Sequence, residues 1–268
     1  MADKSFDDII KELDRAKNDW VVQKTDGLAG LITMVPIPGM NIEMLTTPVT
    51  QKLYSAVMGH NPSHFKGMGD DLPVENIGWG GAVRFCNKMS TMFGLTPVYI
   101  IFKKENTKYE EVTQNASANG FRLPTKLEWE HAAKGGAKYK YAGSSCIDNV
   151  AWYRCNSCKM PHPVGQKKPN GYGLYDMSGN VWEWCWTPFK SLNKNDESYR
   201  YIRGGSWNSG EYDSYYCEVS PKFDMNFYSN EKGIRLESEY SSDVGFRIVR
   251  NIKWVPTLTL AELFDKKV

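Results

Sequence analysis

The sequence of 268 residues has little net charge and contains no long apolar run. Its 33 basic and 31 acidic side chains give a formal charge of +2, so we expect no nucleic-acid partner. A membrane-spanning helix needs about 18 consecutive apolar residues, and we therefore expect no transmembrane segment. Residues 1–8 lack the basic start and apolar centre of an export signal. The expected location is cytoplasmic, or the cell surface if an export signal precedes this sequence.

The sequence is also poor in cysteine, because six residues are too few to hold a chain of this length together by disulfides. Only Cys155 and Cys158 lie close in sequence. With His162 they could form half a zinc site, or they could be a redox pair. Zinc takes ligands from a second cluster and a redox pair opens a helix after a strand, and neither context is present. We expect a loop with free or locally bridged thiols.

Apolar residues make up 41% of the chain, and nine tryptophans add large buried rings, enough for one sizeable core. Hydrophobic spacing predicts short strands and a few helices. The strands are expected over residues 31–37 and 97–102, and the helices over 6–17, 49–58 (capped by Thr47), 74–89 and 258–264. This pattern divides the chain into a helical appendage (1–27), a single domain (28–251) and a tail (252–268).

Thr125 and Glu128 form the strongest local signal. A threonine followed three residues later by a glutamate is a capping box, which predicts a helix that begins after Thr125 and ends at Gly135. Beyond residue 137 regular periodicity fades, and the chain is rich in Gly, Pro, Asn, Trp and Tyr. Large aromatics are rare in disordered segments, so we expect an ordered, loop-rich second half.

Four segments, in this order, carry a family resemblance: residues 121–130 (FRLPTKLEWE), 170–184 (NGYGLYDMSGNVWEW), 203–207 (RGGSW) and 245–250 (GFRIVR). The chain resembles the formylglycine-generating enzyme and sulfatase-modifying-factor family. The resemblance implies an α+β domain with the C-type lectin fold of that family. It does not imply sugar binding, because the sequence contains no Glu-Pro-Asn or Gln-Pro-Asp run.

The family's oxidative chemistry rests on two cysteines that follow the Gly-Gly-Ser segment. At those places this sequence has Ser209 and Ser214. A hydroxyl cannot replace a thiol in binding copper, because a soft metal ion selects sulfur. The four histidines lack the His-x-x-x-His-x-Glu spacing by which one relative binds iron, and no Gly-x-Ser-x-Gly elbow is present. We expect a non-catalytic protein without a redox cofactor. The alternative is a metal-dependent oxidoreductase of the sulfatase-modifying-factor type, or an accessory protein, with an unrecognised active site.

The resemblance also implies one structural calcium ion. Its ligands would be the backbone oxygens of Ser178, Gly179 and Val181 and the carboxylate of Glu183, and oxygen ligands suit a hard cation.

Three arginines, Arg203, Arg247 and Arg250, flank the last two signature segments. They could form an anion clamp. Arginines beside buried aromatics more often pair internally or stack, and we expect internal pairing.

The segment between residues 206 and 246 has an unusual composition, because 19 of its 41 residues are Ser, Tyr, Asn or Asp. Antibody loops use the same mixture, in which Tyr supplies rigid contact area and the short polar residues supply adaptable hydrogen bonds. Flanked by the Gly-Gly-Ser-Trp and Gly-Phe-Arg anchors, this Tyr/Ser-rich segment looks like the variable region of the family branch diversified by retroelements.

That branch implies a protein ligand of unknown identity. The residues expected to contact it are Asn208, Tyr212, Asp213, Tyr215, Tyr216, Phe223, Asp224, Phe227, Tyr228, Asn230, Tyr240, Ser241, Ser242 and Asp243. The alternative is that this is ordinary loop composition. Exposure separates the two, because a contact surface needs its aromatic side chains on the outside of the molecule.

Overall fold

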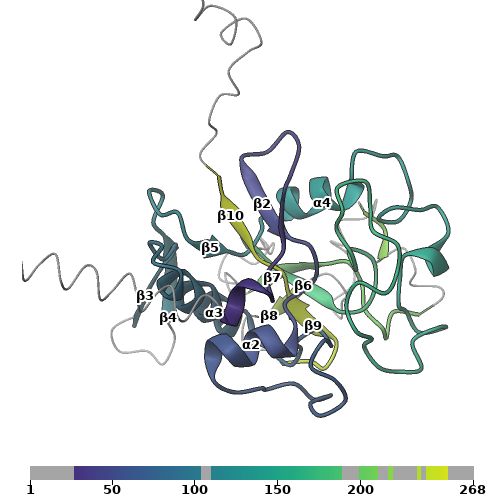
Figure 1. Ribbon diagram of the computed structural model, residues 1–268, viewed down its shortest axis with the longest axis horizontal. Helices are drawn as coiled ribbons and strands as arrows, with labels where there is room; N and C mark the ends of the chain where they lie inside the picture. The colour runs from purple at the N-terminus through teal and green to yellow at the C-terminus, as the bar shows by residue number, and fades with distance from the viewer. Residues whose placement is uncertain are drawn as a thin grey trace, which may run out of the picture.

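The computed structural model describes residues 27–103, 110–188, 199–210, 217–219, 234–236 and 240–252 (Figure 1). The helices are α2 (Gln51–Met58), α3 (Trp79–Met92) and α4 (Lys126–Lys134), with a 3-10 turn η1 (Ile147–Asn149). The strands are β1 (Met34–Pro36), β2 (Ile42–Leu45), β3 (Tyr99–Lys103), β4 (Glu110–Gln114), β5 (Phe121–Arg122), β6 (Trp182–Pro188), β7 (Tyr199–Arg203), β8 (Ile234–Leu236), β9 (Val244–Phe246) and β10 (Val249–Asn251). The α+β class is confirmed.

Two four-stranded sheets organise the fold. One has the order β1-β2-β10-β5 with antiparallel pairs, and the other has the order β8-β7-β6-β9, in which β6 and β9 run parallel. Strands β9 and β10 are separated only by Arg247 and Ile248, so the end of the domain links both sheets. Figure 1 shows β10 beside β2, which joins the two ends of the domain. Strands from the beginning and from the end of the domain therefore belong to one sheet.

The helices cover the sheets with two main apolar clusters. In the larger cluster α2 and α3 pack against β9, with Phe85 and Phe246 5.1 Å apart between ring centroids. In the second, Trp129 of α4 is fully buried among side chains of β2 and β10. None of the helices in the described part of the chain has the length and hydrophobicity that a membrane crossing requires.

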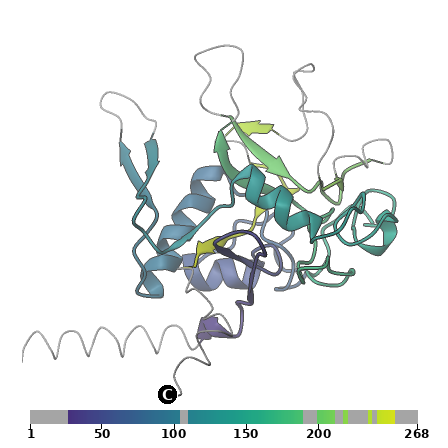
Figure 2. The same cartoon turned by 90° about the horizontal axis from the view of Figure 1, so that it is seen from above.

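Figures 1 and 2 show the hairpin of β3 and β4 at one end of the domain and a lobe of loops after α4 at the other.

The capping box is confirmed at α4. The Thr125 side chain accepts from the Glu128 amide, the Glu128 carboxylate accepts from the Thr125 amide, and the helix ends at Gly135 with a φ of +57°. The expected helices over 6–17 and 258–264 lie outside the described residues.

The prediction that Thr47 caps the helix expected over residues 49–58 was wrong. Helix α2 begins at Gln51 and is capped by Thr50, whose hydroxyl accepts from the Leu53 amide at 3.1 Å. Val49 lies outside the helix because its amide donates to the Phe246 carbonyl and its carbonyl accepts from the Val74 amide. The same hydrogen bond holds the Val74 backbone beside Val49, and α3 starts at Trp79, after the extended Gly78, and not near residue 74.

Candidate binding face and its buried frame

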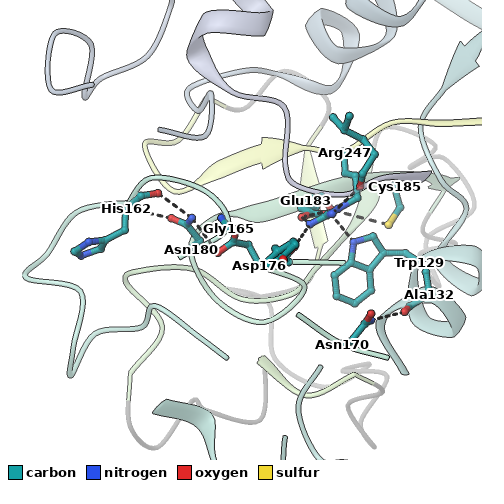
Figure 3. Close-up of polar contacts among 12 residues, drawn as sticks. Trp129, Ala132, His162, Gly165, Asn170, Asp176, Asn180, Glu183, Cys185 and Arg247 are labelled. Atoms are coloured by element: carbon teal, nitrogen blue, oxygen red, sulfur yellow. Dashed lines mark hydrogen bonds and ion pairs between the residues drawn. The ribbon is translucent and has the colours of Figure 1, made fainter. Parts of the chain in front are cut away.

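A fully buried ion pair lies at the centre of the signature segments (Figure 3). The Arg247 Nη2 is 2.8 Å from the Glu183 Oε1, and neither side chain is exposed. The remaining Arg247 donors reach the carbonyls of Leu45 and Tyr175 at 2.8 and 2.7 Å. The Trp129 indole donates to the Glu183 Oε2 at 2.6 Å. Both charges are therefore compensated and hydrogen-bonded, as burial requires.

The other two arginines also pair internally. Arg203 lies 2.8 Å from Glu130, and Arg250 lies 2.6 Å from Glu43. The expectation of internal pairing is confirmed for all three arginines, and the anion clamp is not formed.

Among the residues expected to hold calcium, Glu183 has its carboxylate engaged elsewhere. Both carboxylate oxygens of Glu183 accept hydrogen bonds from Arg247, so the guanidinium supplies the positive charge beside this acid. Gly179 has a φ of +76°, and a side chain there would lie 2.3 Å from the Trp152 carbonyl. The Ser178 hydroxyl donates to the Cys217 carbonyl at 2.6 Å. The donor set fits a calcium ion poorly, because Glu183 is already neutralised. The ion at Ser178, Gly179, Val181 and Glu183 stays a prediction.

A second carboxylate, Asp176, is buried beside this pair. It accepts from the Gly165 amide at 2.7 Å and from the Asn180 side chain at 3.4 Å. Burial raises the pKa of Asp176 to about 6, although the Gly165 hydrogen bond and the nearby Arg247 lower it. Asn180 also exchanges two 3.0 Å hydrogen bonds with the His162 backbone. This network ties the loop around residue 162 to the signature turn (Figure 3).

Asn170 has a role that sequence reasoning missed. Its side-chain amide donates to the Ala132 and Ala133 carbonyls at 2.7 and 3.1 Å, which caps the end of α4. Its carbonyl oxygen accepts from the amides of Tyr172 and Leu174. An Asn before Gly signals a turn in the sequence, but the helix that it caps lies 37 residues upstream.

The two ends of the Tyr/Ser-rich segment meet in the interior. The Ser206 hydroxyl donates to Asp243 at 3.0 Å, and the Trp207 indole donates to the Ser242 carbonyl at 3.1 Å. The Asp243 carbonyl accepts from the Trp182 amide at 2.8 Å, which attaches this closure to β6. We call residues 206–209 and 241–243 the segment base. It fixes the two ends of the Tyr/Ser-rich segment next to each other and to β6.

Among the residues expected to contact a ligand, Asn208 and Tyr240 are exposed, and Tyr240 has 71% of its surface open to solvent. Ser241 and Ser242 are half-buried. Asp243 is a correction: it is buried, and its carboxylate accepts from Ser206 and Ser241, so it belongs to the segment base. The others lie outside the described residues: Tyr212, Asp213, Tyr215, Tyr216, Phe223, Asp224, Phe227, Tyr228 and Asn230.

Ser209 has a structural role in the segment base. Its buried hydroxyl accepts from the Ser206 amide at 2.9 Å, and its carbonyl accepts from the Arg154 amide at 3.0 Å. Nearby Cys217 is also buried, which raises the pKa of its thiol to about 12. That thiol is protonated at neutral pH and is a poor nucleophile and metal ligand. Ser214 lies outside the described residues.

The cysteine pair of the lobe is accessible. Cys155 and Cys158 are exposed and free, as expected for a loop. The turn between them contacts the segment base, because the buried Ser157 hydroxyl donates to the Trp207 carbonyl at 2.8 Å. His162 stacks on Trp152 with ring centroids 3.8 Å apart.

The fold and its buried arginine–carboxylate frame define a loop-rich α+β domain of the C-type lectin type. A family model described as the sulfatase-modifying factor enzyme 1-like domain matches residues 6–252. The chain therefore belongs to the formylglycine-generating enzyme and sulfatase-modifying-factor family.

Three relatives show how varied this family is. The chaperone protein LppX of Paenibacillus barcinonensis is 40% identical over 220 residues, which cover 70% of this chain and 76% of that protein. The structure of Treponema denticola variable protein 1 is similar with a TM-score of 0.67 and 34% identity, over 82% of this chain and 92% of that one. The formylglycine-generating enzyme of Streptomyces coelicolor is 38% identical over 95 residues, 30% of each chain.

Proposed function

We propose that this domain is a non-catalytic, protein-binding member of its family, which displays diversified residues of the Tyr/Ser-rich segment on a fixed scaffold. The observation that carries the proposal is the closure of the segment base by Ser206 and Asp243. A closed, buried base fixes both ends of the segment, so exposed residues between them can vary while the buried Cys217 and Val219 stay in the core. The exposed Asn208 within this base and Tyr240 beside it are of the types that binding loops favour.

The similar proteins support the same class. One is named a variable protein and another is named a chaperone, and neither name is that of an oxidoreductase. The residues at and near the family's cysteine positions argue against the enzyme alternative. The Ser209 hydroxyl accepts from the backbone, and the Cys217 thiol is buried. The alternative, a metal-dependent oxidoreductase, would need a metal site built from other residues.

Comparison of sister copies of the gene tests the diversification. We expect substitutions to concentrate at Asn208, at Tyr240 and at the Tyr, Asn, Asp and Phe positions between residues 212 and 230. Ser206 and Asp243 should stay constant, because either change leaves a buried partner without its hydrogen bond. Sequencing the copies within one population measures this. Substitutions scattered evenly along the chain, or frequent at Asp243, would refute the proposal.

An oxidation assay tests the absence of catalysis. The purified chain, loaded with copper(I) and given a peptide that contains a cysteine, should form no aldehyde above background, as measured by mass spectrometry. The Streptomyces coelicolor enzyme is the positive control. Conversion by the wild-type chain that depends on copper or iron would replace the proposal with the oxidoreductase alternative.

A further inference from the structure

The small net charge of the chain conceals a strongly basic lobe. Residues 134–168 contain seven basic side chains and one acidic side chain, a local charge of +6 in a chain whose total is +2. The basic residues are Lys134, Lys138, Lys140, Arg154, Lys159, Lys167 and Lys168, and the acid is Asp148. An uneven charge distribution of this kind indicates a surface for an anionic partner, whatever the total charge.

The lobe is an ordered part of the domain. Lys168 donates from its amide to the Asn149 carbonyl at 3.0 Å, and the Asn156 side chain reaches the Ala151 carbonyl at 3.0 Å. Figures 1 and 2 show this stretch as a lobe at the end of the domain opposite the β3–β4 hairpin. The positive charge is thus concentrated at one end.

Three of the seven basic side chains have structural contacts. Lys140 pairs with Glu218 at 3.3 Å. Lys167 lies 4.0 Å from the centroid of the Trp152 ring, and Arg154 donates to the Asn208 carbonyl at 3.1 Å. The other four are exposed lysines, and within the described ranges none has an ion pair: Lys134, Lys138, Lys159 and Lys168. Their charge is available to a partner.

We propose that this lobe binds a membrane surface rich in anionic phosphate headgroups. Six of the seven basic residues are lysines, which act as point charges, whereas nucleic-acid recognition favours the planar fork of arginine. Tyr139, 49% exposed, lies between Lys138 and Lys140 in sequence. An exposed Tyr flanked by lysines suits the headgroup region, where its apolar ring and polar hydroxyl are both accommodated. Each lysine near such a surface strengthens binding about fivefold.

Sedimentation with vesicles tests the proposal on the full chain. The wild-type protein should bind vesicles that contain both phosphatidylglycerol and phosphatidylcholine at low salt and should dissociate from them at high salt. It should not bind vesicles of pure phosphatidylcholine. The lobe variant changes Lys134, Lys138, Lys159 and Lys168 to glutamine. Its partition coefficient should fall by about 100-fold or more. The control variant makes the same change at four exposed lysines elsewhere, Lys52, Lys66, Lys88 and Lys103, and has the same total charge.

The control variant should keep most of the binding. Equal losses in the two variants would show that only net charge matters and would overturn the assignment of the lobe. Binding to pure phosphatidylcholine, or no binding by the wild type, would overturn it as well. Tighter binding to duplex DNA than to anionic vesicles at equal phosphate concentration would show that the lobe serves nucleic acid. Circular dichroism of each variant verifies that the fold is intact.

Discussion

Replacement of Arg247 by methionine should lower the free energy of unfolding by about 3–5 kcal/mol. The change leaves Glu183 as a charge with no exposed surface and no cation beside it. It also removes the donors to the Leu45 and Tyr175 carbonyls. Urea denaturation at neutral pH measures the loss. It is the largest effect that we expect from a single side chain of the frame.

The matched control is Arg250→Met. Arg250 forms an ion pair of similar length with Glu43, but those side chains are 33% and 20% exposed. Water screens such a pair, and its loss should cost less than about 1 kcal/mol. Both variants remove one guanidinium from the same stretch of chain, and the difference between them measures the buried pair together with the donors to the Leu45 and Tyr175 carbonyls. Equal losses would contradict the role given to the buried pair.

A double variant separates the pair from its surroundings. Glu183→Gln combined with Arg247→Met removes the isolated charge, so it should be less destabilised than the two single effects together. The Gln oxygen can still accept from Trp129, which donates to Glu183 in the wild type. Additive losses would show that the two side chains do not interact.

The features predicted correctly from the sequence are those that depend on residues close together in the chain. The capping box of Thr125 and Glu128 depends on residues three apart, and the structure contains it as expected. Thr47 failed as a cap because Val49 is held by Phe246, almost two hundred residues away. No local pattern reports such a contact. The cap therefore moved to Thr50.

In the candidate site, too, the sequence did not reveal contacts between residues far apart in the chain. The sequence predicted that the arginines pair internally, but it could not identify Glu183 as the partner of Arg247, 64 residues distant. Glu183 was assigned to calcium because the family resemblance implied it, and that ion stays a prediction. Asp243 was grouped with the contact residues because its neighbours Ser241 and Ser242 have the same composition. Only the three-dimensional contact with Ser206 shows that it closes the segment base.

Asp176 should make the protein less stable as the pH rises through the weakly acidic range. Burial raises the pKa of this carboxyl from 3.8 to about 6 in the folded state. The folded protein therefore holds the proton more tightly than the unfolded chain does. The resulting stabilisation is complete below pH 3.8 and is lost as the pH rises through about 6. The loss from this group amounts to about 3 kcal/mol between those limits.

The variant Asp176→Asn tests whether this carboxyl lowers the stability as the pH rises. Asparagine keeps an oxygen that can accept from the Gly165 amide, but it cannot ionise. The free energy of unfolding of the variant, relative to wild type, should therefore rise by up to about 3 kcal/mol between pH 4 and pH 7. Urea denaturation across that range gives the difference, and the carboxyl carbon shift of Asp176 in NMR should titrate near pH 6. Parallel stability curves, or a titration near 3.8, would show that the buried acid is ionised without cost because Arg247 acts more strongly than burial.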